Sequence, residues 1–196
     1  IDCGKKKIKE MHKFIKNIEN IISQDFCDNI MKDSWDWQSS TFANNNENIG
    51  VKKSKERVVM DEAYITDKVQ KYWPGLLNCT KLACDEYKKF TDLPKMHFFN
   101  PERTTNFRIN KYGVGGFMSE HIDNIHHSHK QELGFPQASL LFFLNDDYEG
   151  GEIFIAEKMF KPKKGSVIIF PSNFMFPHYV KKVTKGERYS IITWLM

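Results

Sequence analysis

From Phe98 onward the chain is a series of short β-rich segments, and this pattern constrains the fold more than any other feature of the sequence. Glycine pairs such as Gly115 and Gly116, and polar clusters such as the one at residues 145–147, separate the segments as turns separate strands. Seven or eight short strands at this spacing are typical of an antiparallel sandwich or barrel of the jelly-roll type. The expected strands cover residues 106–112, 118–122, 139–144, 152–156, 166–170, 176–183 and 188–195.

The N-terminal part has a mixed pattern. Apolar residues at positions 8, 11, 15, 18 and 22 fit a helical stripe, but the same stretch also fits a strand that leads into a helix capped by Ser23. We favour the strand and capped helix, with Cys27, Ile30 and Met31 as the buried face of the helix. Residues 35–42 are expected to form a strand, and residues 44–55, which are rich in Asn and Lys, an exposed loop.

Two further helices are expected before the β-rich part. Asp61 is a suitable cap for a helix over residues 62–73, which Pro74 would end, and a second helix would run from Gly75 to about Phe90. The fold class is therefore mainly β with N-terminal helices (α+β). We expect a single domain over residues 1–196, in which residues 1–97 support a jelly-roll core at residues 98–196.

Length and composition limit the class of protein. A chain of 196 residues can bury one sizeable core, and its 40% hydrophobic and 14% aromatic content excludes a disordered chain. The net charge of +4 comes from scattered residues, which argues against a nucleic-acid partner. The four cysteines lack any CxxC spacing, which favours reduced thiols in a cytoplasm, whether of a microbe or of a virus-infected host. The apolar runs are too short to cross a bilayer, so no membrane partner is expected.

The stretch EHIDNIHHSH, residues 120–129, raises the question of a metal site. In an extended segment, His121 and Asp123 leave the same face, as two ligands of one metal must. His178, at the start of a later β-like segment, supplies a third ligand. Two histidines and one carboxylate on one face of an octahedron are typical of non-haem iron(II) oxygenases, whereas zinc more often takes a closed tetrahedral set. The other histidines of the stretch follow the strand and are expected to be solvated, namely His126, His127 and His129.

Arg188 begins the last expected strand, ten residues after His178. A four-residue turn would return the chain antiparallel and leave Arg188 beside Val183, about 16 Å from His178 at roughly 3.3 Å per residue. A metal and a five-carbon diacid fill such a span, and a guanidinium group suits the far carboxylate of that diacid. The alternative is a surface ion pair of Arg188 with Glu187 or Asp147.

Several stretches then resemble one known family, the iron(II)- and 2-oxoglutarate-dependent dioxygenases, and within it the prolyl 4-hydroxylase-like group. The matching stretches are RINKYGVGGFMSEHID, LLFFLND followed by GGEIFI, KPKKGSVIIFP and PHYVKKVTKGERYSIITW. The resemblance covers residue 107 to the C-terminus, and more loosely residues 20–31. It implies a double-stranded β-helix, cupin-like core, with iron(II), 2-oxoglutarate as cosubstrate, O2 and, as an optional addition, ascorbate.

The resemblance also implies roles for individual residues. His121, Asp123 and His178 would be the iron ligands. Arg188 would bind the C5 carboxylate of 2-oxoglutarate, and Tyr112 would hydrogen-bond the same group, although Tyr112 also fits a plain core position. Period-2 alternation places further side chains on the Arg188 face, where Ser190 would complete an Arg-x-Ser arrangement and Trp194 would wall the pocket near iron, with Ile192 between them. Arg108 and Asn110 share the Tyr112 face and either touch substrate or are satisfied polar residues of the barrel.

The function that this resemblance implies is hydroxylation of a peptidyl proline, with release of succinate and CO2. The partner would then be a protein or peptide that contains proline. The alternatives are the same chemistry on a lysyl residue, a free amino acid or a small molecule, and a binding module of the same fold without turnover. Nucleic-acid demethylases of the superfamily typically carry a second arginine six residues after the first, and here that position is Trp194.

Overall fold

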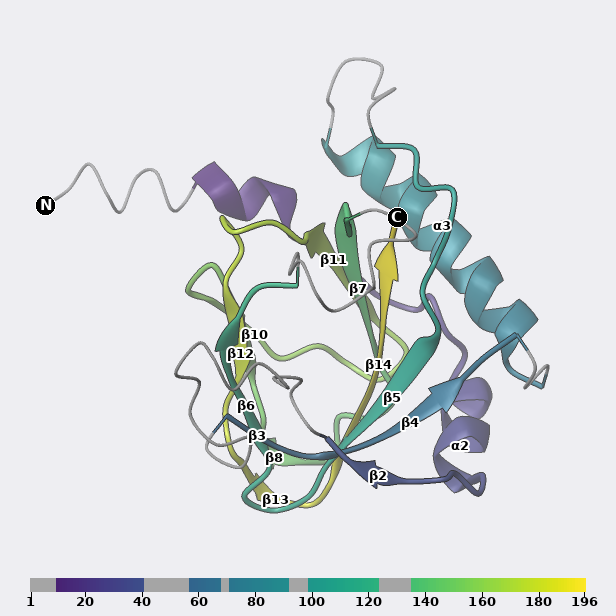
Figure 1. Cartoon of the computed structure of the whole chain (residues 1–196), viewed down its shortest axis with the longest axis vertical. Coiled ribbons are helices and arrows are strands. Elements are labelled where there is room, and N and C mark those ends of the chain that lie inside the picture. Colours follow the sequence, from purple (N-terminus) through teal and green to yellow (C-terminus); the bar gives the residue numbers. More distant parts are fainter. Residues whose placement is uncertain (1–9, 41–56, 68–70, 92–98, 124–134) are drawn as a thin grey trace, which may run out of the picture.

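The computed structural model describes residues 10–40, 57–67, 71–91, 99–123 and 135–196. Two antiparallel β-sheets face each other, and two helices cover the outer face of the larger sheet (Figure 1). The helices are α2 (Gln24–Lys32) and α3 (Trp73–Thr91), and a short 3-10 helix, η1 (His12–Phe14), precedes them. The predicted antiparallel sandwich is therefore present. No helix in the described part of the chain is long and apolar enough to cross a membrane.

The larger sheet has seven strands in the order β1-β11-β7-β14-β5-β4-β2. Its central strands, β7 (Ala138–Phe143) and β14 (Arg188–Leu195), pair along most of their lengths. Because helices cover one face and the second sheet covers the other, every residue of β7 is buried. The remaining strands are β1 (Lys16–Ile18), β2 (Gln38–Ser39), β4 (Asp61–Ile65), β5 (Phe107–Tyr112) and β11 (Val167–Pro171).

The smaller sheet has five strands in the order β10-β9-β12-β6-β3 and occupies the left half of Figure 1. A separate two-stranded ribbon, β13 with β8, lies at the lower end of the sandwich in the same view. The strands of the smaller sheet are β3 (Val58–Val59), β6 (Phe117–His121), β9 (Ile153–Ile155), β10 (Lys158–Phe160) and β12 (His178–Val180), and those of the ribbon are β8 (Glu149–Gly150) and β13 (Val183–Lys185).

Alternating side chains of the larger sheet supply two cores. Leu140 and Phe142 of β7 pack in an outer core against the helices, whereas Leu141 and Phe143 pack in an inner core between the sheets. Such fully buried aromatic residues are expensive to truncate, at about 3–5 kcal/mol for Phe→Ala. The inner core fixes the spacing of the two sheets, and His178 and Arg188 are buried on the same inner faces.

The structure confirms most expectations for the N-terminal part. A strand leads into α2, and the Ser23 hydroxyl caps α2 by accepting a hydrogen bond from the Phe26 amide. Cys27 and Ile30 are fully buried, as predicted, whereas Met31, the third residue of the predicted buried face, is only partly buried. Helix α3 begins two residues earlier than expected, because Pro74 in the first turn of a helix costs no hydrogen bond.

The helix expected over residues 62–73 is wrong. Residues Asp61–Ile65 form strand β4 instead, in which Ala63 and Ile65 are buried and Tyr64 is exposed. This two-residue alternation is a strand pattern, and pairing of β4 with β5 satisfies its backbone. The strand expected at residues 35–42 is shorter than predicted, because only Gln38–Ser39 is a strand within the described residues. The loop expected at residues 44–55 lies outside the described residues.

All seven strands expected after residue 98 occur, with small shifts at their ends. The expected segment 176–183 is divided into β12 and β13. Strands β8 and β10 were not expected. The hairpin expected between His178 and Arg188 is wrong, because β12 pairs with β6 and β9 in the smaller sheet whereas β14 pairs with β5 and β7 in the larger one. Strand β13 carries the chain between the sheets, and the register partner of Arg188 is Tyr112 rather than Val183.

Candidate metal centre

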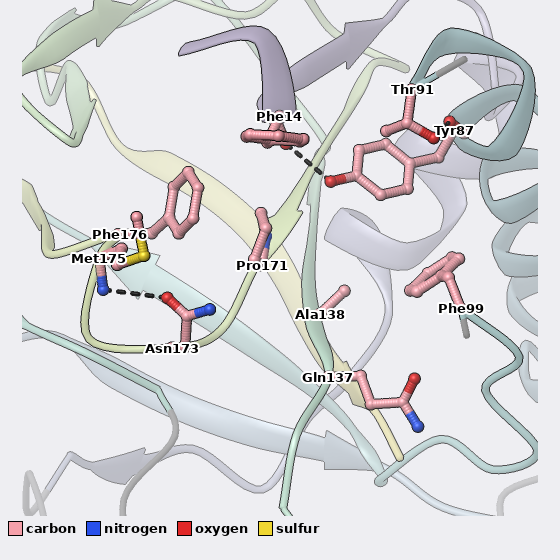
Figure 2. A pocket seen from close by; sticks show the side chains of 10 residues that line it. All are labelled: Phe14, Tyr87, Thr91, Phe99, Gln137, Ala138, Pro171, Asn173, Met175 and Phe176. Carbon is pink, nitrogen blue, oxygen red and sulfur yellow. Dashed lines mark hydrogen bonds between the residues drawn. The ribbon is translucent and has the colours of Figure 1, made fainter. Parts of the chain in front are cut away.

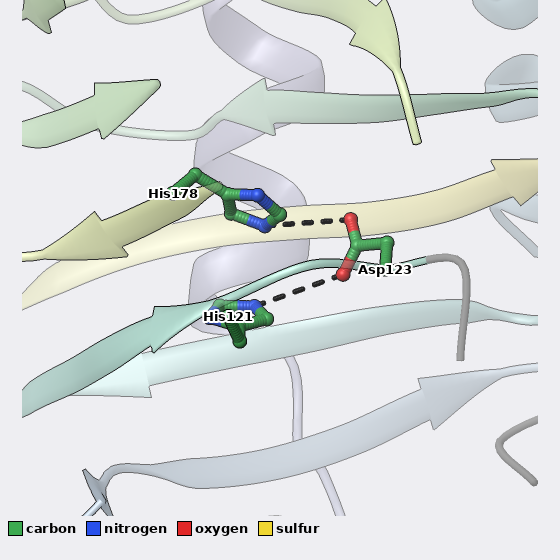
Figure 3. A group of neighbouring side chains, drawn as sticks. All are labelled: His121, Asp123 and His178. Atoms are coloured by element: carbon green, nitrogen blue, oxygen red, sulfur yellow. Dashed lines mark ion pairs between the residues drawn. The ribbon is translucent and has the colours of Figure 1, made fainter. Parts of the chain in front are cut away.

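His121, Asp123 and His178 lie together between the two sheets (Figure 3). The antiparallel pairing of β6 with β12 places His121 directly opposite His178, with ring centroids 4.2 Å apart. The Asp123 carboxylate lies between the imidazoles, with Oδ1 3.7 Å from Nε2 of His121 and Oδ2 3.4 Å from Nε2 of His178. In the described part of the chain, this is the only group of three His, Cys, Asp or Glu side chains close enough to share a metal ion.

Backbone carbonyl groups orient both imidazoles. Nδ1 of His121 lies 2.8 Å from the Ser119 carbonyl oxygen, and Nδ1 of His178 lies 3.1 Å from the Phe176 carbonyl oxygen. Because a carbonyl oxygen only accepts, each Nδ1 must donate, which leaves Nε2 as the atom available for a metal. Phe170 packs edge-on against the His178 ring at 5.0 Å and limits its rotation.

The electrostatics of the three groups suit a cation. Burial lowers the pKa of His121 to about 3, and repulsion by His178 adds to this effect. Burial alone would raise the pKa of Asp123, but attraction to the two imidazoles and a hydrogen bond from Ser139 lower it well below its ordinary value. Burial also opposes a charge on His178, but attraction to Asp123 outweighs it and raises the pKa of His178. A divalent ion would take the place of that proton beside the carboxylate.

The donor set fits iron(II). Two neutral imidazoles and one carboxylate from the same side form the facial arrangement of non-haem iron(II) sites and leave the opposite positions open. A structural zinc site would need a fourth protein ligand, and the described residues supply no further His, Cys, Asp or Glu to this group.

Arg188 is fully buried at the start of β14 and lies in the same interior. Its guanidinium carbon lies 4.9 Å from the Tyr112 ring centroid and 5.3 Å from that of Phe143. Nη1 donates to the Ser190 hydroxyl at 3.0 Å, whereas Nε and Nη2 have no hydrogen-bond partner. Buried donors of a charged group are costly to leave unsatisfied, so this arrangement fits an anionic ligand. The surface ion pair of Arg188 considered as an alternative is excluded by this burial.

Gly151 makes room for the Arg188 side chain. Its φ is +64°, and a Cβ at this position would lie 3.0 Å from Cδ of Arg188 and 3.0 Å from Cγ2 of Val183. From the sequence alone, Gly150 and Gly151 belong only to the turn expected between the strands at residues 139–144 and 152–156. A second function of the glycine pair, as space for a buried arginine, could not be recognised without the non-local packing.

The other expected side chains share the inner face. Ile192 and Trp194 pack in the inner core with Tyr112, as the alternation along β14 predicted. The Arg108 guanidinium lies 5.3 Å from the Trp194 ring, and its Nη1 lies 3.6 Å from Glu62 Oε2. Asn110 is buried, and its Oδ1 has no hydrogen-bond partner. His126, His127 and His129 lie outside the described residues.

The sequence did not indicate Ser139 and Ser172 as site residues. The Ser139 hydroxyl donates to Oδ2 of Asp123 at 2.6 Å and lies 2.8 Å from the Ser172 hydroxyl. For Ser139, the only signal in the sequence is a serine near the start of an otherwise apolar segment, ASLLFF. This segment is strand β7, in which every residue is buried.

A largely apolar pocket of about 370 Å³ lies beside the segment that leads to His178 (Figure 2). None of the three candidate metal ligands lines it. Phe176 connects the apolar pocket with the candidate metal centre, because its side chain lines the pocket and its carbonyl oxygen orients His178. The pocket walls come from η1, helix α3 and the segments around β7 and β11, with Phe14, Tyr87, Thr91, Phe99, Gln137, Ala138, Pro171, Asn173, Met175 and Phe176.

Comparison with known proteins adds independent findings. Residues 107–196 match the model of the 2OG-Fe(II) oxygenase superfamily. A PKHD-type hydroxylase of Rippkaea orientalis is 32% identical over 135 residues, which cover 66% of this chain and 57% of that protein. The chain thus spans little more than half the length of this curated relative.

Two solved structures show a similar fold. The viral collagen prolyl hydroxylase of Paramecium Bursaria Chlorella virus-1 gives a TM-score of 0.67 at 16% identity, with 92% of this chain and 94% of that chain covered. A Pseudomonas putida prolyl-4-hydroxylase gives a TM-score of 0.65 at 15% identity, with 96% of this chain and 95% of that chain covered. The predicted double-stranded β-helix core is confirmed.

Proposed function

We propose that the chain is an iron(II)- and 2-oxoglutarate-dependent dioxygenase that hydroxylates a peptidyl proline. The proposal starts from the match of residues 107–196, a little under half of the chain, to the model of the 2OG-Fe(II) oxygenase superfamily. The observation that carries the proposal is the pairing of a His-Asp-His centre with a buried arginine inside one sandwich. His121, Asp123 and His178 would hold iron(II), and Arg188 has two unsatisfied donors for an anion. Together the two features would suit a metal ion and a ligand that carries a carboxylate.

Each residue has a defined task in this proposal. Arg188 would bind the far carboxylate of 2-oxoglutarate through Nε and Nη2, since Nη1 is already used by Ser190. The Tyr112 hydroxyl would donate to the same carboxylate. Burial raises the pKa of Tyr112 more than the nearby Arg188 lowers it, so the phenol keeps its proton. The cosubstrate would therefore be held at one end by fixed donors.

Iron(II) and 2-oxoglutarate, when bound, let O2 convert the cosubstrate to succinate and CO2 while one oxygen atom enters a substrate C–H bond. The protein orients these reactants and keeps water away from them. Apolar side chains of the inner core contact both ends of the site, since Phe170 packs against His178 and Phe143 lies against Arg188. A dry pocket limits loss of the oxidising power to solvent.

The choice of proline draws on the named activities of the similar proteins, a collagen prolyl hydroxylase and a prolyl-4-hydroxylase. Trp194 is the register partner of Ser139, which donates a hydrogen bond to Asp123, and the Arg108 guanidinium lies 5.3 Å from the Trp194 ring. This aromatic and cationic pair would suit a substrate ring and a peptide carbonyl. A lysyl residue, a free amino acid or a small molecule would use the same metal centre, and a binding module would keep the fold without turnover.

The test is a peptide library incubated with iron(II), 2-oxoglutarate and O2, with and without ascorbate. We expect an increase of about 16 Da on peptides with proline, including collagen-like repeats, and none on matched peptides in which alanine replaces proline. Fragment spectra locate the added oxygen. Modification of lysyl peptides or of free amino acids alone would refute the proline assignment.

A further inference from the structure

The Asp123 side chain is supported differently from the two histidines. Backbone carbonyl groups hold His121 and His178 within their own segments. Asp123 lies two residues beyond the end of β6 and is held from another strand, by the 2.6 Å hydrogen bond from Ser139 of β7. The position of this carboxylate therefore depends on a contact between segments.

The protons of the two serine hydroxyl groups have a defined direction. An ionised carboxylate only accepts, so the Ser139 hydroxyl must donate to Oδ2 of Asp123. A hydroxyl has a single proton, and Ser139 must therefore accept from Ser172, whose oxygen lies 2.8 Å away. The order of donation is Ser172 to Ser139 to Asp123. Successive hydrogen bonds of this kind polarise one another and strengthen the last one.

Backbone hydrogen bonds hold the main chain at both serines. Ser139 pairs in register with Phe170 of β11 on one side and with Trp194 of β14 on the other. The Ser172 amide donates to the Gln137 carbonyl oxygen at 3.1 Å. Ser139 and Ser172 are 0% and 1% exposed as whole residues, so neither hydroxyl depends on solvent. Two buried hydroxyl groups in an apolar region are costly unless they have partners, and here their partners lead to the carboxylate.

We propose that Ser139 and Ser172 are positioning residues that hold Asp123 so that it binds the metal through one oxygen atom. The Ser139 hydrogen bond engages Oδ2 and resists rotation of the carboxylate into a two-oxygen binding mode. It also withdraws charge from the carboxylate, which leaves the metal more accessible to further anionic ligands. This inference rests on the proposed metal centre, and it adds a support for its third ligand.

The test measures metal binding directly, without turnover. Co(II) titration of the purified full chain gives affinity, and its visible absorption reports the coordination number. We expect Ser139→Ala to weaken Co(II) binding about 10- to 100-fold, as loss of such supporting hydrogen bonds typically does. The absorption bands should change as well, because the freed carboxylate can bind through both oxygens. Ser139→Thr keeps a hydroxyl and should restore both affinity and spectrum.

Two further variants separate positioning from a general effect on the fold. Ser172→Ala leaves the direct hydrogen bond in place and should have a smaller effect in the same direction. Ser166→Ala is the matched control, since Ser166 is equally buried but donates to the Lys163 carbonyl oxygen. It should leave the Co(II) spectrum unchanged. If Ser139→Ala does not fold, the spectrum of Ser172→Ala decides the question.

The outcomes distinguish this inference from the proposed function. Co(II) binding by the wild type with unchanged affinity and spectrum in both serine variants would overturn the positioning role and leave the metal centre intact. An equal loss in Ser166→Ala would overturn it too, because the effect would then be one of packing. A wild-type chain that binds no Co(II), Mn(II) or Fe(II) would overturn both proposals.

Discussion

Arg188 and Tyr112 are register partners across β14 and β5, and the Arg188 guanidinium carbon lies 4.9 Å from the centre of the Tyr112 ring. This pairing places a permanent charge against an aromatic face at the bottom of a buried site, with two donors unsatisfied. The pair is the cosubstrate end of the proposed site, and the metal ligands are the other end.

The first prediction concerns the cosubstrate end. Replacement of Arg188 by alanine should raise the 2-oxoglutarate concentration required for half-saturation about 10- to 100-fold, the cost of losing charge-assisted hydrogen bonds. Arg188→Lys should restore 2-oxoglutarate binding only poorly, because lysine lacks the planar pair of donors of arginine. Metal affinity, measured by titration, should change little in either variant. An unchanged 2-oxoglutarate requirement would remove Arg188 from the cosubstrate site.

The second prediction separates the Tyr112 hydroxyl from its ring. Tyr112→Phe keeps the aromatic face under Arg188 but removes the donor, so the 2-oxoglutarate requirement should rise about 3- to 10-fold, less than for Arg188→Ala. Because burial raises the pKa of Tyr112, the phenol remains a donor well above neutral pH. The ratio of the wild-type requirement to that of Tyr112→Phe should therefore stay constant between about pH 7 and pH 9. A ratio that rises steadily across this range would show that the phenol ionises, because the wild type would then lose the same donor that Tyr112→Phe lacks.

The third prediction concerns the metal ligands. His178→Ala and Asp123→Ala should each abolish Fe(II) binding, because two remaining protein ligands do not make a facial site. His127→Ala should bind iron like the wild type, since the sequence places that histidine after the strand. Equilibrium dialysis with metal analysis measures this. Equal loss of iron in all three variants would contradict the assignment of His121, Asp123 and His178 as the metal ligands.

The fourth prediction tests the space around Arg188. Gly151→Ala should destabilise the fold by about 1–3 kcal/mol, because alanine disfavours a positive φ and its Cβ would meet Cδ of Arg188 at 3.0 Å. It should also weaken 2-oxoglutarate binding, since the guanidinium must move. Gly115→Ala is the matched control, because Gly115 also has a positive φ, +83°, but a Cβ there meets nothing within 4 Å. Thermal unfolding and cosubstrate titration read out the two effects, and equal results for both glycines would exclude the proposed role.

Local patterns predicted the local structure well. The strand before α2 and the Ser23 cap follow from residues within a few positions of one another. The inner face of β14 follows from simple alternation of Arg188 to Trp194. Strand β4 was misread because Asp61 resembles a helix cap, although Ala63 and Ile65 alternate as in a strand.

Contacts between distant segments could not be predicted in this way. The ribbon of β8 and β13 moves the chain from one sheet to the other, and nothing in residues 178–188 alone indicates it. For the same reason the sequence identified the three candidate ligands by spacing and resemblance but not Ser139, whose function depends on where β7 lies relative to Asp123. The partner of Arg188 was likewise assigned to the wrong strand.

Formation of succinate is the decisive measurement, because the proposed dioxygenase couples iron(II), 2-oxoglutarate and O2. Iron-loaded protein should form succinate and CO2 from 2-oxoglutarate in equal amounts, slowly alone and faster with a substrate peptide. Both products should disappear without O2 and in His178→Ala. Absence of succinate from iron-loaded wild-type protein, with and without peptides, would contradict the dioxygenase function and leave a binding module with this fold.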